Sequence, residues 1–264
     1  MKKTLLTICL VWMCFSLSAQ KIIDLSGKWS FSIDRQDNGE KEKWFSHTLN
    51  DFINLPGSMP EKLKGDEVTA KTQWTGSLYD SSYYYNPYME KYRKEGNIKF
   101  PFFLTPDKHY VGAAWYQKEV NIPADWKGER ILLFLERPHI ETTVWVNGQK
   151  TGMQNSLCVP HQYDITRYVR PGKCTITIRV DNRIKEINVG PDSHSITDQT
   201  QGNWNGIVGR ICLQTTPKTY FDDIQIYPEP EQKLARVKVV IKGAGITKIK
   251  LSAESFNTDK KHIV

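Results

Sequence analysis

The sequence predicts an all-β protein built around a β-sandwich. Short runs that alternate apolar and polar residues recur along the chain; in one of them Trp29, Phe31 and Ile33 fall on the same face. Asn147-Gly148 follows another such run and is a strong hairpin signal, because both residues tolerate a positive φ. No stretch shows a long helical period. Short strands separated by turn residues favour packed antiparallel sheets.

Each predicted strand follows from its local pattern. Residues 115–122 form a run that Pro123 ends, and residues 130–136 are apolar between their two charged ends, as expected for a strand buried on both faces. A β-branched run with a period of two follows the turn at Pro171-Gly172. Residues 163–166 are expected to start a short turn. The predicted strands cover residues 27–33, 115–122, 130–136, 142–146, 149–152, 174–180 and 207–214.

Residues 60–112 interrupt this pattern. The segment 79–92 within them is polar and rich in tyrosine, with three consecutive tyrosines at 83–85. So many aromatic residues are unusual in disordered chain. We expect an ordered surface insertion near the binding face, and a loose loop is the alternative.

A second unit begins after the predicted linker 215–218. Residues 221–227, 235–241 and 249–253 have the composition of strands. The chain then stops at Val264, so we expect this unit, residues 218–264, to be cut short.

The N-terminus has the three parts of a secretory signal peptide. Lys2 and Lys3 precede an apolar core over residues 5–17, and small residues follow at Ser18-Ala19. The core is too short for a membrane anchor, which needs roughly 20 apolar residues. We expect cleavage after Ala19 and export to the periplasm or the outside of the cell. No later segment is long enough to span a membrane.

Charge and cysteine content exclude several classes of protein. Removing residues 1–19 takes away two lysines and no acid, which lowers the net charge from +7 to +5. The basic residues form no stripe, so nucleic-acid binding is not expected. Three cysteines remain at 158, 174 and 212, and we expect buried free thiols, with one disulfide as the alternative. No metal-ligand motif is present, and no cofactor is expected.

Several segments resemble, in order, the sugar-binding domain of glycoside hydrolase family 2. They are residues 24–31, 53–58, 115–123, 144–148, 163–166, 179–182 and 198–210. The resemblance covers about residues 22–217 and extends into the next unit. It implies a jelly-roll (galactose-binding-like) β-sandwich over residues 20–217, then an immunoglobulin-like β-sandwich, here incomplete, and in intact enzymes a catalytic (β/α)8 barrel. Members include β-galactosidases, β-glucuronidases and β-mannosidases.

The resemblance places the family's two catalytic glutamates on the barrel. A barrel takes about 250 residues, and none follows in this sequence. We therefore expect no catalytic residue and no activity in this chain alone, and a missing barrel domain as a partner. A stand-alone carbohydrate-binding module is the first alternative, and an adhesion or scaffold protein without a sugar role is the second.

Five polar and aromatic residues of one loop are candidates for sugar binding. The resemblance implies that this loop reaches the active site. Asp, Asn and Gln pair with sugar hydroxyls, and Trp offers a flat face to the ring. Asp198 is the strongest candidate as a hydroxyl acceptor of a β-linked glycoside. For the others the alternative is structural: a turn, a packing contact or a lone histidine. The candidates are His194, Asp198, Gln201, Asn203 and Trp204.

Other notable side chains are expected to be structural. Trp29, Trp115 and Trp145 lie in alternating strands and should be core residues. Arg137 and His139 are interpreted as a polar turn, with a place at a domain interface as the alternative. Arg179 with Asp181-Asn182 is expected to form a buried network.

Overall fold

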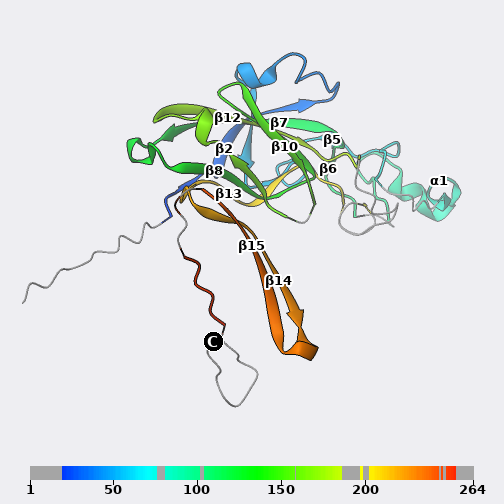
Figure 1. Cartoon of the computed structure of the whole chain (residues 1–264). Coiled ribbons are helices and arrows are strands. Elements are labelled where there is room, and N and C mark those ends of the chain that lie inside the picture. The colour runs from blue at the N-terminus through cyan, green and yellow to red at the C-terminus, as the bar shows by residue number, and fades with distance from the viewer. Residues whose placement is uncertain are drawn as a thin grey trace, which may run out of the picture.

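Two antiparallel sheets pack against each other in the computed structural model of the chain (Figure 1). The structure describes residues 20–75, 81–101, 104–157, 159–185, 197–198, 202–243, 245 and 248–253. The larger sheet contains, in spatial order, β10 (Gln149–Asn155), β9 (Glu141–Val146), β12 (Gly172–Asp181), β7 (Ala113–Ile122), β2 (Gly27–Asp34) and β3 (Asp51–Leu55). The other contains β1 (Ile22–Asp24), β13 (Gly206–Thr216), β8 (Arg130–Pro138) and β11 (His161–Asp164), and β4 (Gly57–Ser58) also pairs with β13. The all-β sandwich prediction is confirmed.

The core lies between the sheets and is built from alternate residues of the strands. Trp29 and Phe31 of β2, Tyr116 of β7, and Leu133 and Leu135 of β8 are all at most 1 % exposed and belong to one cluster. Successive residues of a strand point to opposite faces, which explains why Trp115 leaves this core. Burial of these large apolar side chains is the main stabilising contribution to the sandwich.

A second aromatic cluster covers the outer face of the larger sheet. Trp115 stacks on Trp145 with ring centroids 4.9 Å apart, and Phe45 stacks on Trp145 at 5.1 Å. Trp115 and Trp145 are 0 % and 2 % exposed, because the segment that contains the 3-10 turn η1 (Trp44–Ser46) covers them. The three tryptophans are buried as predicted, and they divide between two clusters.

Local sequence explains the turns. Asn147 and Gly148 both have positive φ, 50° and 77°, in the two-residue connection between β9 and β10, as the hairpin prediction requires. The predicted turn at 163–166 is partly wrong: Tyr163 and Asp164 end β11, which pairs with β8, and the 3-10 turn η4 (Thr166–Tyr168) follows. The remaining 3-10 turns are η2 (Pro87–Tyr92), η3 (Ala124–Trp126) and η5 (Pro230–Gln232).

The insertion 60–112 has its own small aromatic core. Its described part contains β5 (Asp66–Glu67), paired with β6 (Lys108–His109), and the single helical turn α1 (Ser82–Tyr85). Tyr83 is fully buried and stacks on Phe100 at 4.4 Å, and Phe100 contacts Trp74 at 4.9 Å. The prediction of an ordered insertion is confirmed for these residues.

A long hairpin projects from the sandwich (Figure 1). It consists of β14 (Tyr220–Glu229) and β15 (Leu234–Lys242). Ile224 and Ile226 of β14 face Val239 and Val237 of β15 in register, and these two isoleucines are 53 % and 65 % exposed. The third strand predicted at 249–253 is wrong, since these residues form no strand and Leu251 is 70 % exposed. A strand needs a partner for its backbone groups, and no described strand pairs with this segment.

Two cysteines are buried free thiols, as predicted. They are Cys174 in β12 and Cys212 in β13. Burial raises the pKa of Cys174 to about 11 and also raises the pKa of Cys212. Cys158 and the predicted signal peptide lie outside the described residues. Within the described part of the chain, no helix is long and apolar enough to cross a membrane.

Candidate functional site

Asp198 lies at the junction of three segments that are distant in sequence. Its side chain is 1 % exposed; one carboxylate oxygen accepts from the Asn203 amide at 2.9 Å and the other from the Thr75 amide at 2.5 Å. Its backbone N–H donates to the Thr75 carbonyl, and its carbonyl accepts from the Leu104 amide at 3.1 Å. Asp198 therefore fixes the candidate loop to the insertion on both sides.

Asn203 is held by its amide nitrogen and leaves its amide oxygen without a partner. Nδ2 donates to the Asn182 carbonyl at 2.9 Å and to Oγ1 of Thr75 at 3.1 Å. Oδ1 is buried, and it has no hydrogen-bond partner among the described residues. Buried polar atoms are nearly always hydrogen-bonded. The unpaired oxygen is therefore open to a donor, and the two available sources are the unpaired Nε2 of His139, which interacts with the Asn203 side chain, and a group from outside the chain.

Trp204 stacks on a buried histidine that the sequence interpretation assigned to a polar turn. The rings of Trp204 and His139 lie 4.5 Å apart at an angle of 19°. His139 is 4 % exposed, and its Nε2 has no hydrogen-bond partner among the described residues. Burial lowers the pKa of His139 to about 4; the nearby Asn203 side chain acts in the raising direction, without the geometry of a hydrogen bond. His139 is therefore neutral at pH 7.

The pairing of β8 with β13 brings His139 to this place. Pro138 ends β8 opposite Ile207 of β13, and the His139 amide donates to the Gly206 carbonyl at 3.2 Å. Gly206 has a φ of 145°, and a Cβ there would lie 2.5 Å from the Gly57 carbonyl oxygen. Only glycine allows β4 to approach so closely. The place of His139 beside Trp204 could have been predicted from the sequence only if the pairing of β8 with β13 had been predicted first.

Asn205 is a structural residue of the turn that precedes β13. It is fully buried; Oδ1 accepts from the Tyr116 hydroxyl at 2.7 Å, and Nδ2 donates to the carbonyls of Gly112 and Val180 at 2.9 and 3.0 Å. Its amide oxygen and both hydrogens of its amide nitrogen are therefore hydrogen-bonded within the fold. It anchors the start of β13 and so the position of Trp204.

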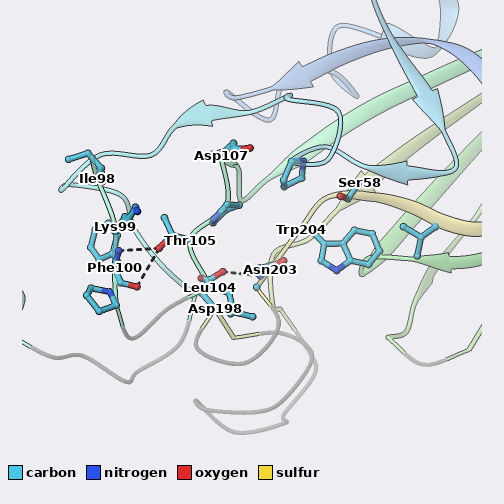
Figure 2. Close-up of a pocket in the computed structure, with 15 residues that line it drawn as sticks. Ser58, Ile98, Lys99, Phe100, Leu104, Thr105, Asp107, Asp198, Asn203 and Trp204 are labelled. Atoms are coloured by element: carbon cyan, nitrogen blue, oxygen red, sulfur yellow. Dashed lines mark hydrogen bonds between the residues drawn. The ribbon is translucent and has the colours of Figure 1, made fainter. Parts of the chain in front are cut away.

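Asp198, Asn203 and Trp204 meet at a cavity of about 880 Å³ (Figure 2). Pockets that bind small molecules range from about 300 to 1,000 Å³. His194 and Gln201 lie outside the described residues. The structure thus brings together the three candidates that it describes. The lining residues are Ser58, Pro60, Ile98, Lys99, Phe100, Pro101, Leu104, Thr105, Pro106, Asp107, Asp198, Gly202, Asn203, Trp204 and Val208.

A second histidine lies behind the carboxylate. His109 of β6 is 7 % exposed, and its Nε2 is 3.8 Å from a carboxylate oxygen of Asp198. Its ring contacts Trp74 at 4.8 Å. Among the described residues, no group of three or more His, Cys, Asp or Glu side chains is arranged to hold a metal ion.

A buried ion network fixes the chain where it leaves β12 toward the candidate loop. Asp181 is fully buried and accepts from Arg179 at 3.1 Å and from Arg183 and Lys185 at 2.6 and 2.8 Å. Burial opposes ionisation of Asp181, but the hydrogen bonds from Arg183 and Lys185 outweigh it and hold its pKa well below the usual range. Arg179 also pairs with Asp37 at 2.6 Å. The predicted buried network is confirmed for Arg179 and Asp181 and extends to these partners, whereas the buried Asn182 side chain bonds instead to the Gly112 amide and the Tyr110 carbonyl.

Comparisons with known proteins agree with this architecture. The family "Glycosyl hydrolases family 2, sugar binding domain" matches residues 22–217. Human β-glucuronidase is 24 % identical over 258 residues, which are 86 % of this chain and 34 % of that protein. The β-glucuronidase of Paenibacillus borealis is 27 % identical over 222 residues, or 78 % of this chain and 31 % of that protein.

Solved structures show the same fold. A β-glucuronidase from an uncultured Clostridium species superposes with a TM-score of 0.56 at 20 % identity, over 86 % of this chain and 34 % of that one. Ruminococcus gnavus β-glucuronidase in complex with D-glucuronic acid gives a TM-score of 0.55 at 17 % identity, over 85 % of this chain and 35 % of that one. The chain spans about a third of the length of the relatives it matches. It belongs to glycosyl hydrolase family 2, and residues 22–217 are the family's sugar-binding domain.

Proposed function

We propose that this chain is the sugar-binding part of an exported family 2 β-glycosidase, and that the loop with Asp198, Asn203 and Trp204 binds the sugar of a β-linked glycoside. The observation that carries the proposal is the buried Oδ1 of Asn203, an acceptor without a partner among the described residues, on a residue that lines the cavity. A sugar hydroxyl is a donor that would satisfy it. The named relatives are β-glucuronidases, so we choose a β-glucuronide as the first ligand to test.

Asp198 and Trp204 add further acceptor positions and an apolar ring surface to the site. A carboxylate has about four acceptor positions, and backbone amides occupy two of those of Asp198. The remaining capacity suits sugar hydroxyls. Trp204 is only partly buried and contributes an apolar ring surface. Burial of His139 behind it keeps that imidazole neutral, so a charged histidine is not part of this recognition.

Ligand-observed saturation-transfer NMR with glucuronic acid, galactose and mannose tests the binding. We expect weak affinity, with dissociation near the millimolar range, or about −4 kcal/mol, because this loop makes only one side of a sugar site. Asn203→Ala should abolish the transfer. Asn121→Ala, an exposed asparagine in β7, is the matched control and should leave it intact. Absence of transfer for all three sugars, or equal loss in both variants, would remove the basis of the proposal.

We assign hydrolysis to a catalytic barrel outside residues 1–264. The family's general acid and nucleophile belong to that barrel, and retaining chemistry needs two carboxyl groups about 5–5.5 Å apart. The purified chain should therefore show no turnover of aryl β-glycosides. Activity that co-purifies with the chain through successive columns and is lost in Asn203→Ala would contradict this assignment.

The β14–β15 hairpin is proposed as the beginning of an immunoglobulin-like domain over residues 218–264. The support is its one-sided apolar face, with exposed Phe221, Ile224 and Ile226. Such a face is stable in water only when another layer covers it. Limited proteolysis should cut this hairpin before the sandwich, and a hairpin as resistant as residues 22–216 would argue against the assignment.

Export rests on the sequence of residues 1–19. The protein recovered from the periplasm or medium should begin at Gln20 by N-terminal sequencing. A mature protein that retains Met1 would contradict export by cleavage.

A further inference from the structure

The outer end of the insertion carries two strongly exposed tyrosines. Tyr85 is the last residue of the helical turn α1 and is 73 % exposed, and Tyr88 lies in the 3-10 turn η2 and is 83 % exposed. Among the residues that the structure describes, no other large hydrophobic side chain is as exposed as these two. α1 lies away from the sheets of the sandwich (Figure 1), and neither tyrosine lines the cavity beside Asp198. Packing of the sandwich therefore does not account for these side chains.

The two tyrosines are held on an ordered support. The buried Tyr83 donates from its hydroxyl to the Tyr92 carbonyl at 2.9 Å, and the Lys99 amide donates to the same carbonyl at 3.1 Å. The Asn86 side chain accepts from the Tyr88 amide at 2.9 Å. Because the backbone is already ordered, binding at this surface would cost less conformational entropy than binding to a loose loop.

A lysine without an ionic partner lies on the same side of η2 as Tyr88. Side chains three residues apart eclipse one another in a 3-10 helix, and Lys91 follows Tyr88 by three residues within η2. Lys91 is exposed, its Nζ lies 4.9 Å from the centroid of the Tyr92 ring, and it forms no ion pair with the described residues. Residues 81–99 contain four basic and two acidic residues. One turn thus presents an aromatic ring and a cation side by side on a basic segment.

This arrangement suits a sugar that carries a carboxylate. A tyrosine ring offers an apolar face to the C–H side of a sugar ring, and its hydroxyl can hydrogen-bond. The Lys91 ammonium can pair with the carboxylate. Tyrosine is also common in protein interfaces, but lysine and glutamate are depleted there, and four such residues follow Tyr88 closely: Glu90, Lys91, Lys94 and Glu95. An acidic glycan therefore fits this surface better than a protein does.

We propose that the outer end of the insertion is a second carbohydrate-binding surface, on which the sugar rings of an acidic polysaccharide stack on Tyr85 and Tyr88 while its carboxylates pair with Lys91. These three residues share no position with the lining of the cavity, so the inference goes beyond the proposed sugar loop. Each contact on an exposed ring is weak, and the surface therefore binds a polymer that engages several contacts at once rather than a single sugar. It keeps the protein on an acidic glycan.

Biolayer interferometry of the full chain on immobilised polysaccharides tests the surface. Polyglucuronate and hydroxyethyl cellulose share a β-1,4-linked backbone and differ in the carboxylate, and we expect binding to polyglucuronate and much weaker binding to the neutral polymer. In the double variant Tyr85→Ala/Tyr88→Ala the dissociation constant for polyglucuronate should rise about tenfold, because the apolar area that the rings bury is lost. Lys91→Gln should weaken the dependence of binding on salt concentration.

The β14–β15 hairpin provides matched controls. Tyr227→Ala and Lys238→Gln replace an exposed tyrosine and an exposed lysine of that hairpin and should bind polyglucuronate as the wild type does. Asn203→Ala should also keep this binding, which separates the surface from the cavity. Because the replaced tyrosines are exposed, the double variant should keep the unfolding midpoint of the wild type.

Four results would overturn the proposal. The first is equal affinity of the double variant and the wild type for polyglucuronate. The second is equal binding to polyacrylate, a carboxylate polymer without sugar rings, because binding would then be ion exchange alone. The third is loss of polymer binding in Asn203→Ala with none in the double variant, which would place the polymer in the cavity. The fourth is a double variant that changes the oligomeric state in sedimentation but not the polymer affinity, since the tyrosines would then join copies of the chain.

Discussion

Replacing Asp181 with alanine is expected to lower the free energy of unfolding by about 3–5 kcal/mol, the usual cost of removing one partner of a buried ion pair. Asp181 is fully buried, and Arg179, Arg183 and Lys185 all donate to it. Arg179 would remain, with a side chain only 9 % exposed, and would lose part of its compensation. Urea unfolding followed by tryptophan fluorescence measures the change.

A surface aspartate provides the matched control. Asp125 pairs with Lys21 at 2.7 Å, but its side chain is 65 % exposed. Exposed ion pairs contribute little to stability because solvent screens them, so Asp125→Ala should leave the free energy of unfolding nearly unchanged. If Asp181→Ala lowers the free energy of unfolding by less than about 1 kcal/mol, water enters the network, and burial does not determine how strongly these ion pairs stabilise the fold.

The stabilisation that Asp181 provides should decrease as the pH falls. The folded state lowers the pKa of Asp181 below its ordinary value of 3.8, so the stabilisation is fully present above that value. It is lost as the pH falls through the lower folded-state pKa, because the unfolded chain then binds the proton more readily. The difference between the wild type and Asp181→Asn should therefore be largest near neutral pH and should narrow below about pH 4.

Replacing Asp198 should have the second-largest effect and should act on stability and binding together. Asp198→Ala leaves the buried amide of Asn203 and the partly buried amide of Thr75 without acceptors. An unsatisfied buried donor costs about 1–3 kcal/mol, and a partly buried donor costs less because water can reach it, so we expect a loss of about 2–4 kcal/mol. Asp198→Asn should cost less, but not zero, because its NH2 group would face one of these two donors.

Asp107 is the control for this experiment. It also lines the cavity but is exposed, so Asp107→Asn should leave the unfolding midpoint unchanged. Saturation transfer from glucuronic acid should disappear in Asp198→Ala. If Asp198→Asn is as stable as the wild type and only its binding falls, Asp198 is a ligand contact alone and its structural role has been overestimated.

The sequence was sufficient for most of the long strands of the sandwich because strand signals are local. Alternation placed Trp29 and Phe31 in the core, and Asn147-Gly148 defined a hairpin within two residues. Alternation also predicts burial of Trp115, but it does not reveal that a distant segment around Phe45 covers that outer face. The strand expected at 249–253 failed for the related reason that strand composition does not create a pairing partner.

The site was only partly accessible from sequence because its contacts are distant. Asp198, Asn203 and Trp204 are close together along the chain, so their residue types alone suggested a sugar loop. His139 joins them through the pairing of β8 with β13, and Thr75 and Leu104 join them through the insertion. No local pattern indicates which carbonyl or amide a buried carboxylate will bind. The double role of Asp198, as anchor and cavity residue, therefore appears only in three dimensions.

The central claim is that this loop is a sugar site rather than a turn that only supports the fold. Protein-observed NMR during titration with phenyl β-D-glucuronide tests it most directly. We predict shifts of the Asn203 side-chain amide, the Trp204 indole N–H and the Leu104 amide, with the β14–β15 hairpin unchanged. Shifts confined to another face of the sandwich, with these three signals silent at saturating ligand, would contradict the account.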